Sequence, residues 1–356
     1  MKVLKFGGTS VGSPERIKSV SNLIADGQPK IVVFSAMSGT TNSLIEIADY
    51  FSRKNSEAAN NIINQLQRKY ESHVLELYSE DKTIQKSKKL LAEIFDLLRS
   101  FSNKEVGERE HKYIVAQGEI ISTNLITNYL LENGVKALLI PALDYMKLNE
   151  NEEPDMSYIK EKLSNFLNAN AGYDLYITQG FICRDYTGEV SNLQRGGSDY
   201  TACIIGAVLK SDEIQIWTDI DGMHNNDPRI VDHTSPVRQL NFEEAAELAY
   251  FGAKILHPTC IQPARYAGVP VKLLNTMDPS APGTIINNKI EKGCIKAVAA
   301  KDNITAIKIV SSRMLLATGF LRKVFEIFET YKTPVDMVTT SEVGVSLSID
   351  NTSHLV

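Results

Sequence analysis

The segment Lys5-Phe6-Gly7-Gly8-Thr9-Ser10 ends the first apolar run of the chain and turns it at two glycines. The run, residues 3–6, is typical of a β-strand, and Ser13-Pro14-Glu15 predicts the start of a helix. A lysine near a strand end, followed by a glycine turn that leads toward a helix, offers a cation and exposed N–H groups to a triphosphate. Taken alone, the segment could equally be a tight strand exit with a lysine at the edge of a sheet.

The order of these residues excludes one class of phosphate-binding loop. A Walker A loop carries its lysine after the glycine run, in the pattern G-x-x-x-x-G-K-[ST]. Here Gly7 to Gly12 has the right span, but Ser13 follows directly and the lysine comes before the glycines. The segment is therefore not the loop of a P-loop nucleotidase.

Short β-branched runs alternate with helical patterns over roughly the first 290 residues, which predicts an α/β fold with helices on both faces of a sheet. A long stretch from about residue 41 to residue 133 is helical in pattern almost throughout. Beyond the first strand, we expect strands at 31–34, 135–140, 175–178, 214–218 and 271–274.

Composition and charge narrow the class of protein. A chain of 356 residues with 43% hydrophobic and 23% charged residues is typical of a globular protein of two domains. Its net charge of −5 speaks against a nucleic-acid partner. The chain starts directly in a strand, and no apolar run reaches the ~18 residues of a membrane span, so we expect a cytoplasmic protein without a membrane partner. Because no two of the four cysteines form C-x-x-C, neither zinc nor disulfides are indicated: Cys183, Cys203, Cys260 and Cys294.

A second glycine turn lies at Gln194-Arg195-Gly196-Gly197-Ser198-Asp199. Ser198 is expected to cap a helix over residues 200–209. An arginine and an acid beside exposed backbone donors could fix a carboxylate and a transferring phosphoryl group, whereas a bare capped helix would not need Arg195.

The expected strand at 214–218 ends in polar residues and leads into Asp221-Gly222-Met223-His224-Asn225-Asn226-Asp227-Pro228-Arg229. Ligands of open α/β sheets gather at the carboxyl ends of strands, so this loop is placed to hold a nucleotide. The alternative is a solvated turn rich in Asp, Asn and Gly, which its composition alone favours.

Together these motifs resemble those of the aspartate kinases. The matching segments occur in that family's order over essentially the whole chain: Lys5–Val11, Gln117-Gly118-Glu119, Arg195–Tyr200, Trp217-Thr218-Asp219 and Phe251–Pro258. The resemblance implies a three-layer αβα sandwich of the amino acid kinase (carbamate-kinase-like) type over residues 1–293. It also implies an incomplete ferredoxin-like ACT regulatory region over residues 294–356.

The resemblance further implies transfer of the ATP γ-phosphate to the β-carboxylate of L-aspartate, which gives 4-phospho-L-aspartate and ADP on the route to lysine, threonine and methionine. Because the acceptor is already a nucleophile, alignment and charge stabilisation should suffice, with Mg²⁺ riding on the nucleotide phosphates and with protein ligands that the sequence does not identify. The resemblance assigns Lys5 and Asp199 to catalysis, with Asp199 as an orienting residue or as a partner of the metal's ligands, and not as a base. It assigns Thr41, Glu119, Arg195 and Ser198 to aspartate, and Lys5, Gly7, Gly8, Thr218, Asp219, His224, Arg229, Lys254 and Ile255 to the nucleotide.

Three positions depart from the family pattern. His224 stands where a tyrosine is usual, Cys183 replaces a common glycine, and Ser191-Asn192-Leu193-Gln194 replaces Thr-Thr-Leu-Gly. All three lie beside the expected site, so they put the local loop geometry in question more than the activity.

The last part of the chain reads β-α-β-β, with strands at 304–310, 335–340 and 343–349 and a helix at 319–331. It resembles the first ACT domain of a lysine-regulated aspartate kinase, and ACT modules pair across a dimer, so we expect a homodimer or higher homo-oligomer with lysine as inhibitor. The chain stops before the module is complete, and we expect a truncated polypeptide whose own response to lysine stays open. The expected effector residues are Met314, Gly319, Phe320, Leu321, Asp336, Ser341 and Glu342, although Phe320 and Leu321 fit the core of an amphipathic helix better.

Two other functions fit parts of the sequence. One is a different amino acid kinase, such as a glutamate 5-kinase, against which residues 195–199 and the ACT-like end argue. The other is an amino acid sensor without catalysis, against which the joint presence of Lys5, Glu119, Arg195 and Asp199 argues.

Overall fold

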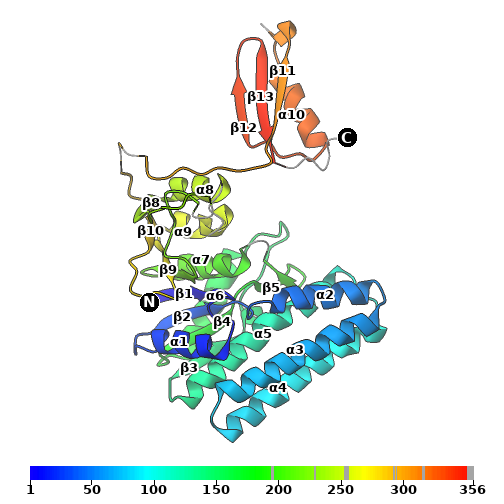
Figure 1. The fold of residues 1–356 in the computed structure, drawn as a ribbon, viewed down its shortest axis with the longest axis vertical. Helices are drawn as coiled ribbons and strands as arrows, with labels where there is room; N and C mark the ends of the chain where they lie inside the picture. The colour runs from blue at the N-terminus through cyan, green and yellow to red at the C-terminus, as the bar shows by residue number, and fades with distance from the viewer. Residues whose placement is uncertain are drawn as a thin grey trace. The chain divides into compact units, whose positions relative to one another are not determined.

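The computed structural model describes residues 1–193, 196–227, 230–251, 256–291, 293, 295–314 and 317–350. It divides into two compact units, Met1–Val298 and Ala299–Val356 (Figure 1). The second unit begins five residues after the expected start of the regulatory region (299 against 294).

An eight-stranded sheet forms the centre of the first unit, in the order β3-β4-β2-β1-β7-β9-β10-β8. Every pairing is parallel except that between β9 and β10. Strands β2, β4 and β3 lie on one side of β1, and β7, β9, β10 and β8 lie on the other. The strand order therefore reverses at β1, and ligands of parallel sheets collect at such points. The strands are β1 (Lys2–Phe6), β2 (Lys30–Phe34), β3 (Ala137–Ile140), β4 (Leu175–Gln179), β7 (Ile214–Thr218), β8 (Gln239–Asn241), β9 (Val271–Asn275) and β10 (Thr284–Asn287).

Side chains of β1 alternate between two separate cores, one on each face of the sheet. Leu4 and Phe6 pack into a core with the apolar faces of α1 to α5, while Val3 packs into a second core with α6 and α7. Lys5 shares the face of Val3 because side chains on a strand alternate with period two. The αβα layering expected from the sequence is confirmed, and it directs Lys5 toward α7.

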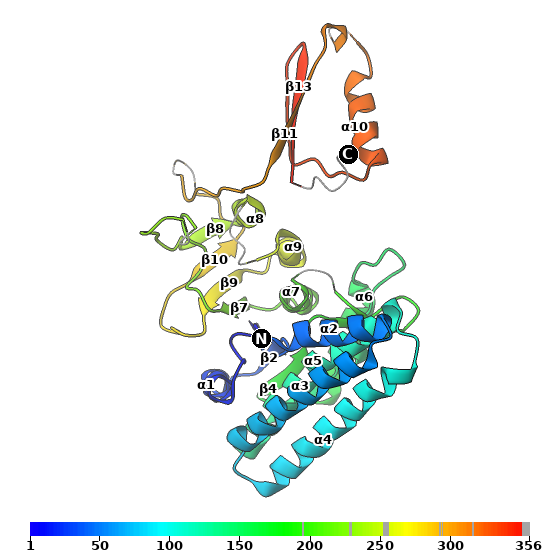
Figure 2. The ribbon, with the colours of Figure 1, turned by 45° about the vertical axis from the view of Figure 1, so that its right-hand side comes forward.

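The helices cover both faces of this sheet. The region expected to be helical between residues 41 and 133 forms α2 to α5, and α3 and α4 lie side by side as a long pair (Figures 1 and 2). Ser13 caps the first helix as predicted, because its Oγ accepts from the Arg16 N–H at 3.4 Å. The helices are α1 (Pro14–Ile24), α2 (Thr40–Ser52), α3 (Ser56–Leu77), α4 (Asp81–Arg99), α5 (Glu108–Glu132), α6 (Met156–Ala169), α7 (Gly197–Leu209), α8 (Phe242–Phe251) and α9 (Gln262–Ala267).

The second unit is a small β-α-β-β arrangement, as the sequence predicts. Its elements are β11 (Thr305–Val310), α10 (Phe320–Thr330), β12 (Met337–Thr340) and β13 (Gly344–Ile349). The sheet is antiparallel in the order β11-β13-β12, and α10 packs through Val324 on Val345 and Leu347.

Two expectations from the sequence, on the cysteines and on membrane spans, can be compared with the described residues. Cys183, Cys203 and Cys260 are buried, while Cys294 lies outside the described residues. Among the helices that the structure describes, none is long and apolar enough to cross a membrane.

Gly118 on α5 lets this helix approach the end of β2. A Cβ at Gly118 would lie 2.9 Å from the Ala36 Cβ and 3.2 Å from the Leu44 Cδ1. Alanine favours a helix over glycine by about 1 kcal/mol, but such contacts in a packed core cost about 1–3 kcal/mol. We therefore expect Gly118→Ala to lower the free energy of unfolding by about 1 kcal/mol in urea denaturation.

Leu131→Ala is the matched control, because Leu131 lies on the same helix and is 47% exposed. Its effect should stay within about 0.5 kcal/mol. If Gly118→Ala proved as stable as the unchanged chain, the close approach of α5 to β2 would not be a constraint on the fold.

Candidate active site

A cavity of about 240 Å³ opens at the carboxyl ends of β1 and β2, beside the start of α7. The parallel strands on either side of β1 end at the same edge, so their following loops converge here. Five of the residues singled out from the sequence line it together. The lining residues are Lys5, Ser35, Thr41, Glu119, Phe181, Gly196, Gly197, Ser198 and Asp199.

An ion pair between Lys5 and Asp199 forms one side of the cavity. The Lys5 Nζ lies 2.7 Å from the Asp199 Oδ1, and the two side chains are only 12% and 13% exposed. Asp199 lies in the first turn of α7, where the helix dipole favours a carboxylate. The pair therefore holds a lysine ammonium group at the cavity wall, next to the N-terminal N–H groups of α7, which have no partner within the helix.

Glu119 on α5 forms the opposite side of the cavity. Its side chain is buried, and its Oε1 accepts from the Ala36 N–H at 3.1 Å. Its Oε2 is buried and has no hydrogen-bond partner among the described residues. Burial raises the pKa of Glu119 to about 7, against the weaker effect of the Ala36 N–H. A cationic group entering the cavity would favour the ionised form and supply the missing partner.

The start of α2 brings Thr41 to the cavity, and a residue that the sequence did not indicate helps to hold it there. The preceding Thr40 Oγ1 lies 2.7 Å from the Tyr70 hydroxyl, and both side chains are buried. Gly39 precedes the helix with φ of 82°, a conformation that glycine adopts readily. Tyr70 belongs to the apolar stripe of α3, and its spacing indicates only a core residue.

The second glycine turn differs from the prediction in one respect. Ser198 does not cap the helix: α7 begins at Gly197, and Gly196, with φ of 73°, precedes it. Because glycine adopts this positive φ without strain, the chain enters the helix earlier than a serine cap would allow. Ser198 lies in the first turn instead, and its side chain faces the cavity region near Gly180, where an added Cβ would lie 2.5 Å from the Ser198 Oγ.

Gly7 and Gly8 continue from β1, and Gly8 packs tightly against neighbouring backbone. A Cβ at Gly8 would lie 2.7 Å from the Ala36 carbonyl oxygen, and one at Gly7 would lie 3.4 Å from the Lys5 Nζ. The Ser10 Oγ lies 2.8 Å from the Thr276 Oγ1, which ties the turn to the segment after β9. The backbone around Gly8 therefore leaves no room for a side chain at this position of the turn, and a close backbone turn of this kind suits a phosphate cradle.

Two other lining residues, Ser35 and Phe181, were not indicated by the sequence. Ser35 follows β2, and its N–H donates to the Phe6 carbonyl at 3.2 Å. Phe181 adopts φ of 68°, and its N–H donates to the Thr201 Oγ1 at 3.1 Å. Ser35 could have been found from its place directly after a strand beside β1, whereas the positive φ of Phe181 leaves no signal in the sequence.

Apart from Lys5, the residues expected at the nucleotide lie outside the lining of this cavity or outside the described part of the chain. Thr218 ends β7, and its Oγ1 donates to the Asp219 Oδ1 at 3.1 Å. His224 contacts Asp221 at 2.6 Å and Thr234 at 2.7 Å through its two ring nitrogens. The three residues predicted at the nucleotide, Thr218, Asp219 and His224, do not line the cavity. Arg195, Arg229, Lys254 and Ile255 lie outside the described residues.

The expected effector residues are spread over the second unit. Phe320 and Met314 pack against its small core, but Leu321 is 38% exposed, so the interpretation of Leu321 as a core residue is wrong. The helix is short and only one face meets the sheet, which leaves Leu321 on the outer side. Gly319 precedes α10 with φ of 81°, the Asp336 N–H donates to the Ser348 carbonyl, Ser341 contacts the Gly344 carbonyl, and Glu342 is exposed.

Metal ligands are not concentrated anywhere in the described residues. No group of three or more His, Cys, Asp or Glu side chains there could hold a metal ion. The chemistry of the cavity rests on the Lys5–Asp199 pair, the glycine turns and Glu119.

Comparison with known proteins agrees with this arrangement. Residues 1–275 match the model of the amino acid kinase family. The chain is 34% identical over 355 residues to the lysine-sensitive aspartokinase 3 of Escherichia coli, and the match covers 98% of this chain and 78% of that protein. It is 38% identical over 364 residues to the chloroplastic aspartokinase 1 of Arabidopsis thaliana, but it spans only 63% of that relative's length.

Solved structures give the same result. The crystal structure of E. coli aspartokinase III in complex with aspartate and ADP aligns with a TM-score of 0.80 at 33% identity, covering 99% of this chain and 79% of that chain. The structure of Clostridium acetobutylicum aspartate kinase aligns with a TM-score of 0.80 at 26% identity, covering 98% and 77%. The chain therefore belongs to the amino acid kinase family, in its aspartokinase branch.

Proposed function

We propose that this protein transfers the γ-phosphoryl group of ATP to the β-carboxylate of L-aspartate, which gives 4-phospho-L-aspartate and ADP. The observation that carries the proposal is the cavity that has the Lys5–Asp199 ion pair on one side and the buried carboxylate of Glu119 on the other. One end suits a phosphoryl group and the other suits an ammonium group. The crystal structure of E. coli aspartokinase III contains aspartate and ADP.

At the phosphate end, Lys5 stabilises charge on the transferring group, and Asp199 holds the lysine in place. The first N–H groups of α7 and the turn at Gly7 and Gly8 supply further donors to the phosphates. Mg²⁺ bound to the nucleotide would neutralise phosphate charge, and we propose that it is held chiefly by the phosphates themselves. Thr218, Asp219, His224, Arg229, Lys254 and Ile255 are proposed to line the nucleotide.

At the acceptor end, Glu119 accepts hydrogen bonds from the substrate ammonium group, with Thr41 and Ser198 beside it. Arg195 is proposed to bind a carboxylate of aspartate with both of its terminal nitrogens. The reacting carboxylate needs no general base, so the residues act by alignment and by electrostatic stabilisation.

The direct test measures ADP release with aspartate, glutamate and carbamate as acceptors. We expect turnover with aspartate at least a hundredfold above that with the other two, a ratio within reach of a site that pairs every polar group of its substrate. Turnover with glutamate or carbamate instead would identify a different amino acid kinase. Release of ADP with none of the three would support a sensor without catalysis.

Lys5→Ala is the companion variant, and it should lower kcat by about 10²–10³-fold, as expected when a charge stabiliser is lost. Because it leaves Asp199 buried without its partner, the variant could lose stability as well. The double variant Lys5→Met/Asp199→Asn removes both charges and should fold like the unchanged chain, as judged by circular dichroism, while remaining inactive. Substantial activity of the double variant would overturn the role of Lys5.

The raised pKa of Glu119 predicts how aspartate binding depends on pH. The free site holds a proton on Glu119 below about pH 7, whereas the bound ammonium group requires the carboxylate. The KM for aspartate should therefore rise about tenfold between pH 8 and pH 6, the change expected for one proton at this pKa. Neither the ammonium group nor the carboxylates of aspartate titrate in this range, so initial rates at several aspartate concentrations suffice.

Glu119→Gln is the control for this prediction. Its pH dependence of KM should disappear, although its affinity for aspartate should be weak throughout. Since folding raises the pKa of Glu119, the carboxylate lowers stability above about pH 7 and does not below the unfolded value near 4.5. The variant should therefore gain about 3 kcal/mol of unfolding free energy at pH 8.5, and less at pH 5. An equal gain at both pH values would contradict the raised pKa.

We further propose that the second unit binds lysine and lowers activity, as part of a homodimer or larger homo-oligomer. One relative is named as lysine-sensitive, and a solved structure of E. coli aspartokinase III contains lysine and aspartate. Met314, Gly319, Asp336, Ser341 and Glu342 are the proposed contacts. A cytoplasmic location stays a prediction from the sequence.

Titration of activity with lysine and with threonine tests this regulation. The titrations should use this chain and a version extended to the length of its relatives. We expect lysine, and not threonine, to lower the rate of the longer version by fivefold or more, a usual size for coupling between sites. If neither amino acid changed its rate, the proposed regulation would be wrong.

A further inference from the structure

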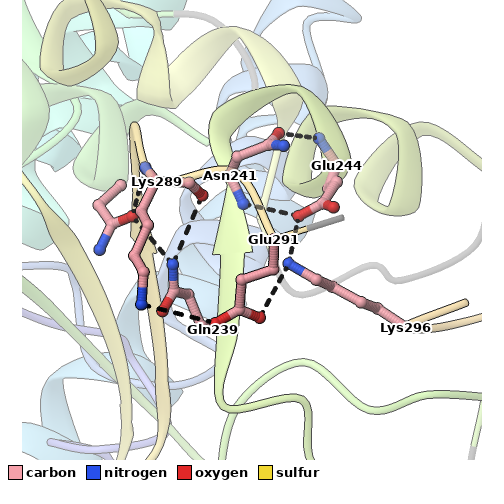
Figure 3. Close-up of polar contacts among 7 residues, drawn as sticks. Gln239, Asn241, Glu244, Lys289, Glu291 and Lys296 are labelled. Atoms are coloured by element: carbon pink, nitrogen blue, oxygen red, sulfur yellow. Dashed lines mark hydrogen bonds and ion pairs between the residues drawn. The ribbon is translucent and has the colours of Figure 1, made fainter. Parts of the chain in front are cut away.

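A short segment, residues 295–298, crosses helix α8 near the end of the first unit and is held there mainly by one lysine. The Lys296 Nζ lies 2.9 Å from the Glu244 Oε2 on α8 and 3.5 Å from the Glu291 Oε2 (Figure 3). The Lys296 side chain is only 9% exposed, although its two partners are 31% and 42% exposed. Lys296 therefore bridges two carboxylates that come from different parts of the chain.

Apolar packing contributes little to this attachment. Ile295 is 89% exposed and Val298 is 59% exposed. A cavity of about 500 Å³, lined by residues of α8, by Leu240 and by residues 295–297, lies beside the ion pairs. Since the apolar side chains of the segment are mostly in solvent, the polar contacts of Lys296 must hold it against the helix.

Glu244 also fixes the beginning of α8. Its Oε2 accepts from the Asn241 N–H at 2.8 Å, and the Asn241 Oδ1 accepts from the Glu244 N–H at 2.8 Å. This reciprocal pair is a capping box, in which two backbone donors at a helix start are satisfied together. Lys296 thus contacts the same oxygen that orients the start of α8 (Figure 3).

The same segment contacts the loop that follows β7. The Val298 N–H donates to the Asn225 carbonyl at 2.9 Å. Asn225 in turn makes two bonds to Ser235, one through its N–H and one through its Oδ1, each at 2.9 Å. His224 beside it is held by Asp221 and Thr234. Residues 295–298 therefore join α8 to the loop that contains the proposed nucleotide residue His224.

From these contacts we infer that Lys296 is a positioning residue for the nucleotide side of the active site. By holding residues 295–298 on Glu244, Lys296 keeps the start of α8 and the loop around Asn225 in fixed positions relative to each other. This inference rests on the proposed function, because it takes the loop after β7 as a wall of the nucleotide site. It does not require aspartate to be the acceptor.

Lys296→Met tests the inference by removing the charge while keeping an unbranched chain. The dissociation constant of ADP with Mg²⁺ should rise about fivefold in calorimetry, the size expected for a partly buried ion pair. The KM for ATP should rise similarly, while the KM for aspartate and kcat change less than twofold. Lys296→Arg, which can contact the same carboxylates, should restore binding to within twofold of the unchanged chain.

Two further variants sharpen the test. Lys289→Met removes an exposed pair with the same Glu291, at 3.7 Å, without touching Glu244, so it should leave ADP binding unchanged. Glu244→Gln keeps an acceptor for the capping box but loses the charge, so it should weaken ADP binding like Lys296→Met. In the double variant Lys296→Met/Glu244→Gln, the two effects should not add.

The outcomes separate this inference from the proposed function. If Lys296→Met binds ADP like the unchanged chain, or raises both KM values equally, the inference is wrong and the proposed function stands. If ADP binding depends on Lys296 but aspartate is not phosphorylated, the inference stands and the acceptor is wrong. If the unchanged chain does not bind ADP, both are wrong.

Discussion

The ion pair between Lys5 and Asp199 is the contact on which the site depends. It forms because Lys5 shares the face of Val3 on β1, and that face is covered by α7. It stays short because Gly180 and Gly197 let the first turn of α7 approach the segment that follows β4, where added side chains would collide with Ser198 and Phe181. A buried pair of this kind contributes little to stability on its own. It holds the Lys5 ammonium group in a position where it can contact a phosphoryl group.

Much of this arrangement could be read from the sequence, because it depends on local rules. Strand alternation places Lys5, the Ser13 cap starts α1, and the β-α-β-β order of the second unit follows from its apolar pattern. The errors arose where a local rule met a tertiary contact. Ser198 looked like a helix cap, but the positive φ of Gly196 starts α7 earlier.

Residues that act through distant contacts left no pattern to read. Tyr70 has the spacing of a core residue, and only the packing of α3 against α2 brings its hydroxyl to Thr40. Lys296 lies in a stretch without apolar periodicity. The two carboxylates that it contacts, those of Glu244 and Glu291, become neighbours only when β8 and β10 pair at the edge of the sheet. The buried state of Glu119 likewise comes from the close packing around Gly118, which no spacing reveals.

The two ends of the cavity belong to different layers of the fold. Lys5 and the start of α7 face one core, whereas Thr41 and Glu119 come from α2 and α5, which pack mainly on the other. Under the proposed function, exchange of residues on α2 and α5 can therefore alter which acceptor fits without disturbing the phosphate end. For protein engineering, this makes the acceptor layer the natural target of a mutant library, and it offers a physical route by which one ancestral phosphotransferase could diversify among carboxylate substrates.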